Sequence, residues 1–328
     1  METVALYDVD STTPNLALAR IARAEGEKGN RVVRYDPTEP LLNAGRFDRI
    51  YASKIFTRSD GRFLDPERME IGGTGVDLRK TLPPEIERLP PDWSLWPGFK
   101  DNLGFAMRGC RRRCDFCFVP EKEGRARPAS TIKDLLVQDS DFLILLDNDF
   151  FGNPEWRERV DEIHRLDLTV NLSQGINVRS ITDEQARALA GLVNARPNRG
   201  GSRLTNLHRT RGQFHFAWDN PKDEARVVAG ISRLDAAGIK RWRMACYVLI
   251  GFNTTPAEDE HRVQTLRRLK IDPFVMPYDP DDARQARFAR WANDKAIFGT
   301  VRTFSDYDGT VRYRPEIAAE PSAQAVLL

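Results

Sequence analysis

The chain has 328 residues, of which 41% are hydrophobic, and a formal net charge of +2 at pH 7. This length and composition exclude a disordered tail and suit one large domain or two unequal ones, and a charge so near zero excludes the global basic field of a dedicated nucleic-acid-binding protein. No stretch approaches the roughly 18 apolar residues of a membrane span, and residues 1–26 carry acidic side chains where a signal peptide has basic ones, so we expect a cytoplasmic protein with reduced thiols and no membrane partner.

The first part of the chain alternates between short apolar runs and one helical pattern, as in an α/β protein with a parallel sheet. We expect a helix at 15–29 and strands at 4–10, 31–36, 48–57 and 69–75. Residues 1–98 are therefore predicted to form a small Rossmann-like parallel-sheet domain and its linker. The prolines within 82–101 predict an extended linker that crosses a surface, with the domain boundary inside it.

The alternation resumes in the second part of the chain. Residues 99–300 are predicted to form an incomplete (β/α)6 barrel, whose chemistry lies at the carboxyl ends of its strands. Residues 301–328 are predicted to be a C-terminal extension with a frayed end. The predicted barrel strands lie near 103–108, 142–147, 168–173, 213–218, 244–250 and 272–276.

Three of the four cysteines lie in RGCRRRCDFCFVPEKEG, residues 108–124. Cys110, Cys114 and Cys117 form C-x3-C-x2-C directly after the first predicted barrel strand, so one loop can place three thiolates around one metal centre. A [4Fe-4S] cluster normally takes four cysteine ligands, and three ligands leave one iron open to a substrate or cofactor. The alternatives are a zinc site completed by Cys246 or a histidine, and thiols that share no role.

With Phe116 before its third cysteine, this loop resembles the signature loop of the radical S-adenosylmethionine (SAM) superfamily, and the resemblance covers about 99–280. It implies a radical SAM enzyme in which Cys110, Cys114 and Cys117 hold a catalytic [4Fe-4S] cluster. Such an enzyme cleaves SAM reductively to methionine and a 5'-deoxyadenosyl radical, which abstracts hydrogen from an unreactive carbon of the substrate. It also implies a reductant such as flavodoxin or ferredoxin. The arginines at 111–113 either form a solvated loop, or dock such a donor or balance the charge of the cluster.

The resemblance also implies SAM contacts at the ends of the predicted barrel strands. LLDNDF at the second strand offers groups for the methionine amino group, although the Gly-Gly-Glu of many members is absent there. SQGINVR at the third strand offers groups for the ribose and carboxylate, and YVLIGFNTTPAED resembles the stretch beside adenine, with Tyr247 in place of its first glycine. The candidate cofactor-binding residues are Phe116, Asp147, Asn148, Asp149, Gln174, Asn177, Arg179, Asp219, Ile250 and Gly251.

Two further residues have a structural and a functional interpretation. The period-two alternation of QFHFAWDN sends Gln213, His215, Ala217 and Asp219 to one face, toward the barrel lumen, and the aromatic residues to the other. His215 is then either a hydrogen-bonded core histidine or a lumen ligand, and Asp219 at the strand end is the better functional candidate. Cys246, within an apolar run, is expected to be a core residue rather than a catalytic thiol or an extra ligand.

The N-terminal pattern, including IGGTG at 71–75, resembles the cobalamin-binding domains that precede some radical SAM barrels. The glycines either let a ligand approach the backbone or make a turn. The D-x-H-x-x-G motif is absent and no histidine precedes His164, so histidine ligation of cobalt is excluded. We favour a docking or substrate domain that has kept the fold, and keep cobalamin as the alternative cofactor.

Three classes of function follow. The first is a radical SAM enzyme acting on a nucleotide or nucleic acid, because the whole chain resembles bacterial and phage radical SAM proteins whose substrates are mostly unassigned. The second is a cobalamin-dependent radical SAM methyltransferase, and the third is a non-catalytic zinc or iron–sulfur module that binds nucleic acid. The basic stretch 194–212 is either a solvated insertion or a grip on a polyanion, through Arg196, Arg199, Arg203, Arg209 and Arg211.

Overall fold

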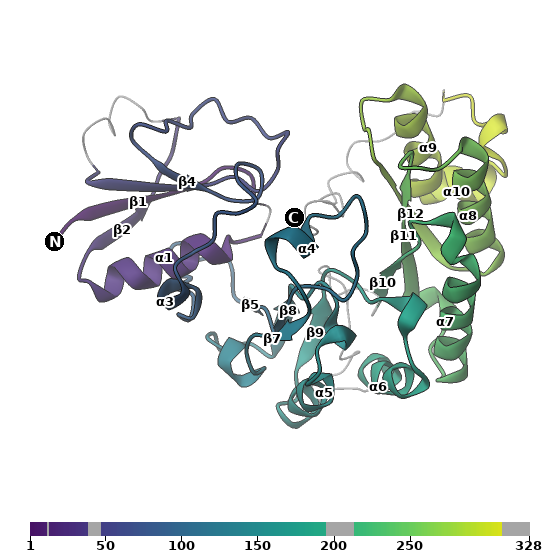
Figure 1. Ribbon diagram of the computed structural model, residues 1–328, viewed down its shortest axis with the longest axis horizontal. Helices are drawn as coiled ribbons and strands as arrows, with labels where there is room; N and C mark the ends of the chain where they lie inside the picture. Colours follow the sequence, from purple (N-terminus) through teal and green to yellow (C-terminus); the bar gives the residue numbers. More distant parts are fainter. Residues whose placement is uncertain (12, 39–46, 195–212, 310–328) are drawn as a thin grey trace.

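The structure is a computed structural model, and it describes residues 1–11, 13–38, 47–194 and 213–309 (Figure 1). The five arginines of the basic stretch and the end of the predicted C-terminal extension lie outside the described residues. The described residues form an α/β fold in which the strands of both main sheet regions pair in parallel. The expected α/β class is thus confirmed.

The first sheet lies on the left in Figure 1 and has the strand order β2-β1-β3-β4. Helix α1 (Leu16–Glu27) follows β1 and begins at Asn15, whose side-chain oxygen accepts a hydrogen bond from the Leu18 amide and so caps the helix. The chain leaves β1 toward β2 on one side and then returns to place β3 on the other. The strands are β1 (Thr3–Asp8), β2 (Arg31–Arg34), β3 (Arg49–Ser53) and β4 (Glu70–Gly72), which confirms the four predicted positions.

Residues 82–101 contain no long helix, as their prolines predict, but the segment is not extended throughout. This segment contains a one-turn helix, α3 (Pro84–Glu87), and buries the indoles of Trp93 and Trp96. Prolines prevent a long helix here, but leaving two indoles in water costs more than turning the chain inward. Trp93 and Trp96 join an apolar cluster that also holds residues of α1 and β1 from the first sheet and Phe142 from the second region.

The second region contains the six predicted strands in chain order. One parallel sheet has the order β5-β8-β9 and another β10-β11-β12, and a parallel bridge between Ile176 and Phe216 connects them. A short antiparallel pair, β6 (Met107–Arg108) and β7 (Arg127–Pro128), flanks the cysteine loop. The six strands are β5 (Asn102–Gly104), β8 (Phe142–Leu145), β9 (Thr169–Leu172), β10 (Phe214–Ala217), β11 (Met244–Ile250) and β12 (Asp272–Pro277).

Helices follow most of these strands and pack on one side of them, while the cysteine loop and α4 lie on the other side (Figure 1). Phe214, Phe216 and Trp218 are buried in the core on the helix side, as the period-two pattern predicts. This arrangement leaves the opposite face and the carboxyl ends of the strands for the site. The helices are α4 (Val119–Lys122), α5 (Trp156–Arg165), α6 (Asp183–Asn194), α7 (Glu224–Ala236), α8 (Pro256–Arg268), α9 (Ala283–Asn293) and α10 (Lys295–Thr300).

Candidate active site

The cysteine loop, residues 109–118, runs from β6 to α4 and is closed at its base by backbone contacts. The Cys110 amide donates to the Gly124 carbonyl at 3.3 Å, and the Cys117 amide donates to the Cys114 carbonyl at 2.9 Å. Gly109 has a φ of 77°, and a Cβ there would lie 2.3 Å from the Arg125 carbonyl oxygen. Only glycine therefore permits the close approach that starts the loop.

Cys110, Cys114 and Cys117 are all half-buried in this loop. Across the part of the chain that the structure describes, no three Cys, His, Asp or Glu side chains are gathered as a set of metal ligands. Burial raises the pKa of Cys110 to about 11, and the charge of Asp149 adds to the rise. Three thiols on one loop are the donor set that an iron–sulfur cluster takes, so these residues fit such a group.

The first contact between this loop and a strand end is an ion pair. Arg111 Nε lies 2.7 Å from Asp149 Oδ2, and Nη2 lies 2.9 Å from Oδ1, so the pair is bidentate. Asp149 follows β8, and its side chain is 1% exposed. A Cβ on Gly152 would lie 2.4 Å from Asp149 Oδ2, so the pair also depends on the absence of a side chain at that position.

The second contact runs from Arg112 to Asp223, in the turn between β10 and α7. Asp223 accepts from Arg179 Nη1 at 2.8 Å and lies 3.5 Å from Arg112 Nη2. Burial works against ionisation of Asp223, but the Arg179 guanidinium outweighs it and holds the pKa of this carboxyl below its usual value. Arg179 Nε also donates to Asn177 Oδ1 at 3.4 Å. The sequence analysis missed Asp223, whose only signal is an acidic residue shortly after a predicted strand.

The third contact is aromatic. The rings of Phe116 and Phe252 meet edge to face, with their centroids 5.5 Å apart. The ring centroids of Phe252 and Tyr278 are 4.8 Å apart. Phe252 follows Ile250 and Gly251 at the end of β11. Ile250 is buried in the core, and Gly251 has a φ of 76°. The predicted adenine stretch therefore lies beside the third cysteine.

Asp219 and Arg262 join the ends of β10 and β11. The Leu249 amide donates to Asp219 Oδ1 at 3.3 Å, and burial raises the pKa of this carboxyl. Arg262 of α8 donates to the Trp218 carbonyl at 2.7 Å and to the Leu249 carbonyl at 2.9 Å. Sequence reasoning missed Arg262, because a buried arginine in a polar helix has no distinguishing pattern.

Asp147, Asn148 and Gln174 contact other groups than the cysteines. The Ala106 amide donates to Asp147 Oδ1 at 2.8 Å, and burial raises the pKa of this carboxyl to about 7. Asn148 Nδ2 donates to Glu123 Oε2 at 3.1 Å. Among the described residues, Asp147 Oδ2 and Gln174 Oε1 are buried without a hydrogen-bond partner. Of the predicted cofactor contacts, Phe116 lies in the cysteine loop and Asp149 contacts that loop through Arg111. Asn148 and Gln174 instead line the cavity described below.

Of the remaining two residues, Cys246 has the predicted core role, whereas the half-buried His215 contacts an aromatic ring. Cys246 is fully buried in the core of the second region, which confirms the core interpretation. His215 stacks on Tyr247 with ring centroids 4.7 Å apart, and burial lowers its pKa to about 4. His215 is therefore neutral near pH 7.

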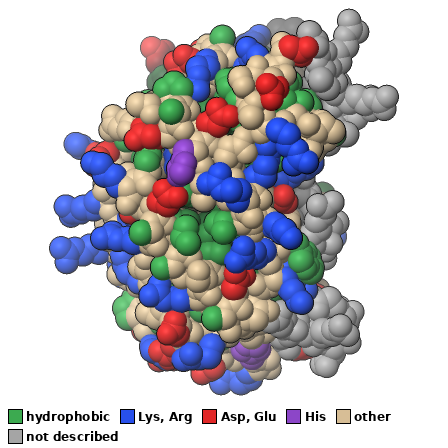
Figure 2. All heavy atoms as spheres, turned by 90° about the vertical axis from the view of Figure 1, so that its right-hand side faces the viewer, with side chains coloured by type: hydrophobic (Ala, Val, Ile, Leu, Met, Phe, Trp, Pro, Cys, Tyr) green, Lys and Arg blue, Asp and Glu red, His purple; other side chains and the backbone are tan. Residues whose placement is uncertain are grey.

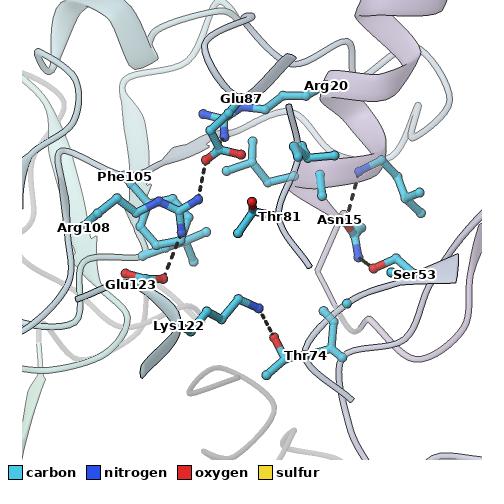
Figure 3. A pocket seen from close by; sticks show the side chains of 18 of the residues that line it. Asn15, Arg20, Ser53, Thr74, Thr81, Glu87, Phe105, Arg108, Lys122 and Glu123 are labelled. Carbon is cyan, nitrogen blue, oxygen red and sulfur yellow. Dashed lines mark hydrogen bonds and ion pairs between the residues drawn. The ribbon is translucent and has the colours of Figure 1, made fainter. Parts of the chain in front are cut away.

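A cavity of about 940 Å³ lies between the carboxyl edge of the first sheet and the segment around α4. Figure 3 shows a chain of alternating charges along one wall, in which Arg20 and Arg108 both contact Glu87 and Arg108 also contacts Glu123. Lys122 and Thr74 form a hydrogen bond across the lower part of the view. The cavity thus carries charged groups from both halves of the chain.

The outer surface on the right of Figure 1 shows no single sign of charge. In Figure 2, positive and negative side chains alternate over this face.

Comparisons with known proteins found no match: no family model fits the chain, and no curated protein or solved structure is significantly similar to it. Among the described residues, no helix combines the length and apolarity needed to cross a membrane.

Proposed function

We propose that this protein is a radical SAM enzyme whose Cys110, Cys114 and Cys117 hold a [4Fe-4S] cluster at the carboxyl ends of an incomplete (β/α)6 barrel. One observation carries the proposal: a single cysteine loop makes contacts after three different strands. Arg111 pairs with Asp149 after β8, Arg112 with Asp223 after β10, and Phe116 packs on Phe252 after β11. In folds built from parallel β/α units, chemistry is placed at these strand ends.

In this proposal the cluster, when bound, supplies the electron that cleaves the sulfonium bond of SAM. The chain's own residues orient the cofactor and exclude water around it. In this proposal Asn177 and Arg179 would contact the polar parts of SAM, with Arg179 held by Asp223 at 2.8 Å. Gly251 would lie beside the adenine, next to the Gln285 side chain that packs against it. Asp149 is held in one orientation by Arg111, so its role is to position the loop.

The overall reaction needs one electron and one hydrogen atom. A cluster held by Cys110, Cys114 and Cys117 would pass this electron from a reductant such as flavodoxin or ferredoxin to SAM. The products would then be methionine, 5'-deoxyadenosine and a substrate radical whose hydrogen atom has moved to 5'-deoxyadenosine. The proposed substrate class is a nucleotide or nucleic acid. We also propose the cytoplasm as the location, because thiolate ligands need reduced cysteines.

Cobalamin is not part of this proposal. A Cβ on Gly73 would lie 2.2 Å from the Lys54 carbonyl oxygen, and a Cβ on Gly75 would lie 2.5 Å from the Phe56 carbonyl carbon. These glycines therefore allow two backbone segments to pack, which favours the turn interpretation of IGGTG over a ligand contact.

The test is anaerobic reconstitution with iron and sulfide, followed by dithionite and SAM and detection of 5'-deoxyadenosine. Alanine at Cys110, Cys114 or Cys117 should abolish both the iron–sulfur absorbance and the product. Cys246→Ala is the matched control and should keep both, because Cys246 is a core residue. Equal loss in all four variants, with zinc in the purified protein, would favour the zinc module instead.

A further inference from the structure

The cavity of about 940 Å³ is built on the carboxyl edge of the first sheet. Asn15, the N-cap of α1, donates from Nδ2 to Oγ of Ser53, the last residue of β3, at 2.9 Å, so the start of the helix is linked to the end of this strand (Figure 3). Because β2 and β3 lie on opposite sides of β1, the connections reverse direction at this point of the sheet. Ligands of open parallel sheets bind in the crevice at such a reversal.

The N-terminus of α1 opens into the same cavity. Leu16, Ala17 and Leu18 line it, and the Asn15 side chain caps only the Leu18 amide. The first-turn amides of a helix have no carbonyl partner within the helix, and they carry the positive end of its dipole. The first turn of α1 contains no acidic residue. This end of the helix therefore favours an anion.

Two basic side chains outside the first turn of α1 also favour a negatively charged ligand. Lys122 donates to Thr74 Oγ1 and forms no ion pair with any carboxylate of the described residues, and burial lowers its pKa. Arg20 lines the cavity with a side chain that is 10% exposed, and its Nε has no partner among the described residues although Nη1 pairs with Glu87 at 2.7 Å. Buried positive charge of this kind is stabilised by an anionic partner.

Apolar side chains line the cavity beside the ion-paired wall of Arg108, Glu87 and Glu123. Phe105, Phe118 and Leu82 face the cavity from the α4 side and from the segment after β4. Small-molecule sites have volumes of roughly 300–1,000 Å³ and combine apolar walls with a few polar groups. The cavity fits this description, since apolar and charged side chains both line it and the Arg108 guanidinium lies 3.7 Å from the Phe105 ring centroid.

We propose that this cavity binds a phosphate ester of nucleotide size, with the phosphate held by the first turn of α1 and the Lys122 ammonium and the organic part packed on Phe105 and Phe118. The binding itself is independent of any cluster. That the ligand is the substrate of the radical chemistry rests on the proposed function.

The experiment measures binding of uridine 5'-monophosphate to the full chain by isothermal titration calorimetry, with uridine as the uncharged control. Ala17→Glu puts a carboxylate into the first turn, where it favours the helix but repels a phosphate, and should weaken binding about tenfold or more. Ala17→Gln has the same size without the charge and should bind nearly as the parent does. Lys122→Gln should also weaken binding, whereas Lys240→Gln on the exposed surface should not.

The inference is overturned if uridine binds as tightly as its phosphate ester, if neither binds, or if Ala17→Glu and Ala17→Gln behave alike. The same titration with Cys110, Cys114 and Cys117 all replaced by alanine separates the two proposals. Binding should persist in that variant. Binding of uridine 5'-monophosphate without formation of 5'-deoxyadenosine would overturn only the proposed enzymatic activity. Formation of 5'-deoxyadenosine without binding of uridine 5'-monophosphate would overturn only the proposed binding site.

Discussion

Asp147 and Asp149 are two positions apart and have opposite environments. Asp149 is satisfied by a bidentate pair with Arg111, whereas Asp147 is buried with one oxygen that lacks a partner among the described residues. The motif LLDNDF indicates that one acidic residue matters, but it cannot distinguish them. The distinguishing partner, Arg111, lies 38 residues away in sequence, and its contact depends on how the cysteine loop folds.

The environment of Asp147 predicts a pH-dependent stability. Burial raises its pKa from the ordinary value of 3.8 to about 7, so between these values the native state binds more protons than the unfolded chain. The free energy of unfolding should therefore fall as the pH rises through this window and level off above it. The shift corresponds to several kcal/mol at most, since one pKa unit is worth about 1.4 kcal/mol.

Asp147→Asn tests this expectation because it keeps an oxygen for the Ala106 amide and removes the charge. Relative to the parent, the variant should gain stability as the pH is raised from about 5 to about 8 in urea unfolding. The exposed Asp139→Asn is the control. A difference between Asp147→Asn and the parent that stays constant with pH would show that the carboxyl is ionised in the native state throughout.

At the scale of elements, the strands of the two parallel regions and the helix α1 are predicted, whereas the two-residue strands and the four-residue helices are not. All ten predicted strands are found within a few residues, because each contains a run of apolar residues bounded by turn residues. The pair β6 and β7 has two residues in each strand, and α3 and α4 have four residues each, so none has a detectable period. These short elements shape the cysteine loop and the cavity, so the site depends on what periodicity cannot predict.

Gly152 shows how one element is held against another. It follows β8 in a short turn, and an added Cβ would lie 2.4 Å from Asp149 Oδ2 and 2.8 Å from Arg111 Nε. Gly152→Ala should therefore break the pair that fixes the loop, at a cost of about 1–3 kcal/mol from overpacking. Alkylation of Cys110, Cys114 and Cys117 in the metal-free protein should become faster, and iron content after reconstitution should fall.

The control for this variant is Gly191→Ala in α6. A Cβ there would meet His164 at 3.6 Å, an ordinary contact, so the change should be neutral or add up to about 1 kcal/mol of helix stability. If Gly152→Ala leaves both the alkylation rate and the iron content at the level of Gly191→Ala, the Arg111–Asp149 pair does not position the loop.

At the scale of the whole molecule, the boundary expected near residue 98 is crossed by a shared apolar cluster. Leu18 of α1, Trp96 of the linker segment and Phe142 of β8 all belong to it. The sequence shows where the prolines of this segment lie, but it does not show that the two indoles between them are buried. The residues that bury these indoles belong to α1, β1 and β8, which are distant in sequence. The two sheet regions are therefore expected to depend on each other for stability.

Trp96→Ala tests this dependence. The side chain is 8% exposed, and its ring meets Trp93 edge to face with centroids 6.0 Å apart, so its removal should cost about 3–5 kcal/mol. Trp242→Ala removes an indole that is 55% exposed, and it should change stability by no more than about 0.5 kcal/mol. In hydrogen exchange read by mass spectrometry, Trp96→Ala should lower protection both in β1 of the first sheet and in β8 of the second region, because the lost side chain supports the two together. Loss of protection in β1 alone, with β8 as protected as in Trp242→Ala, would show instead that the second region folds without help from the first.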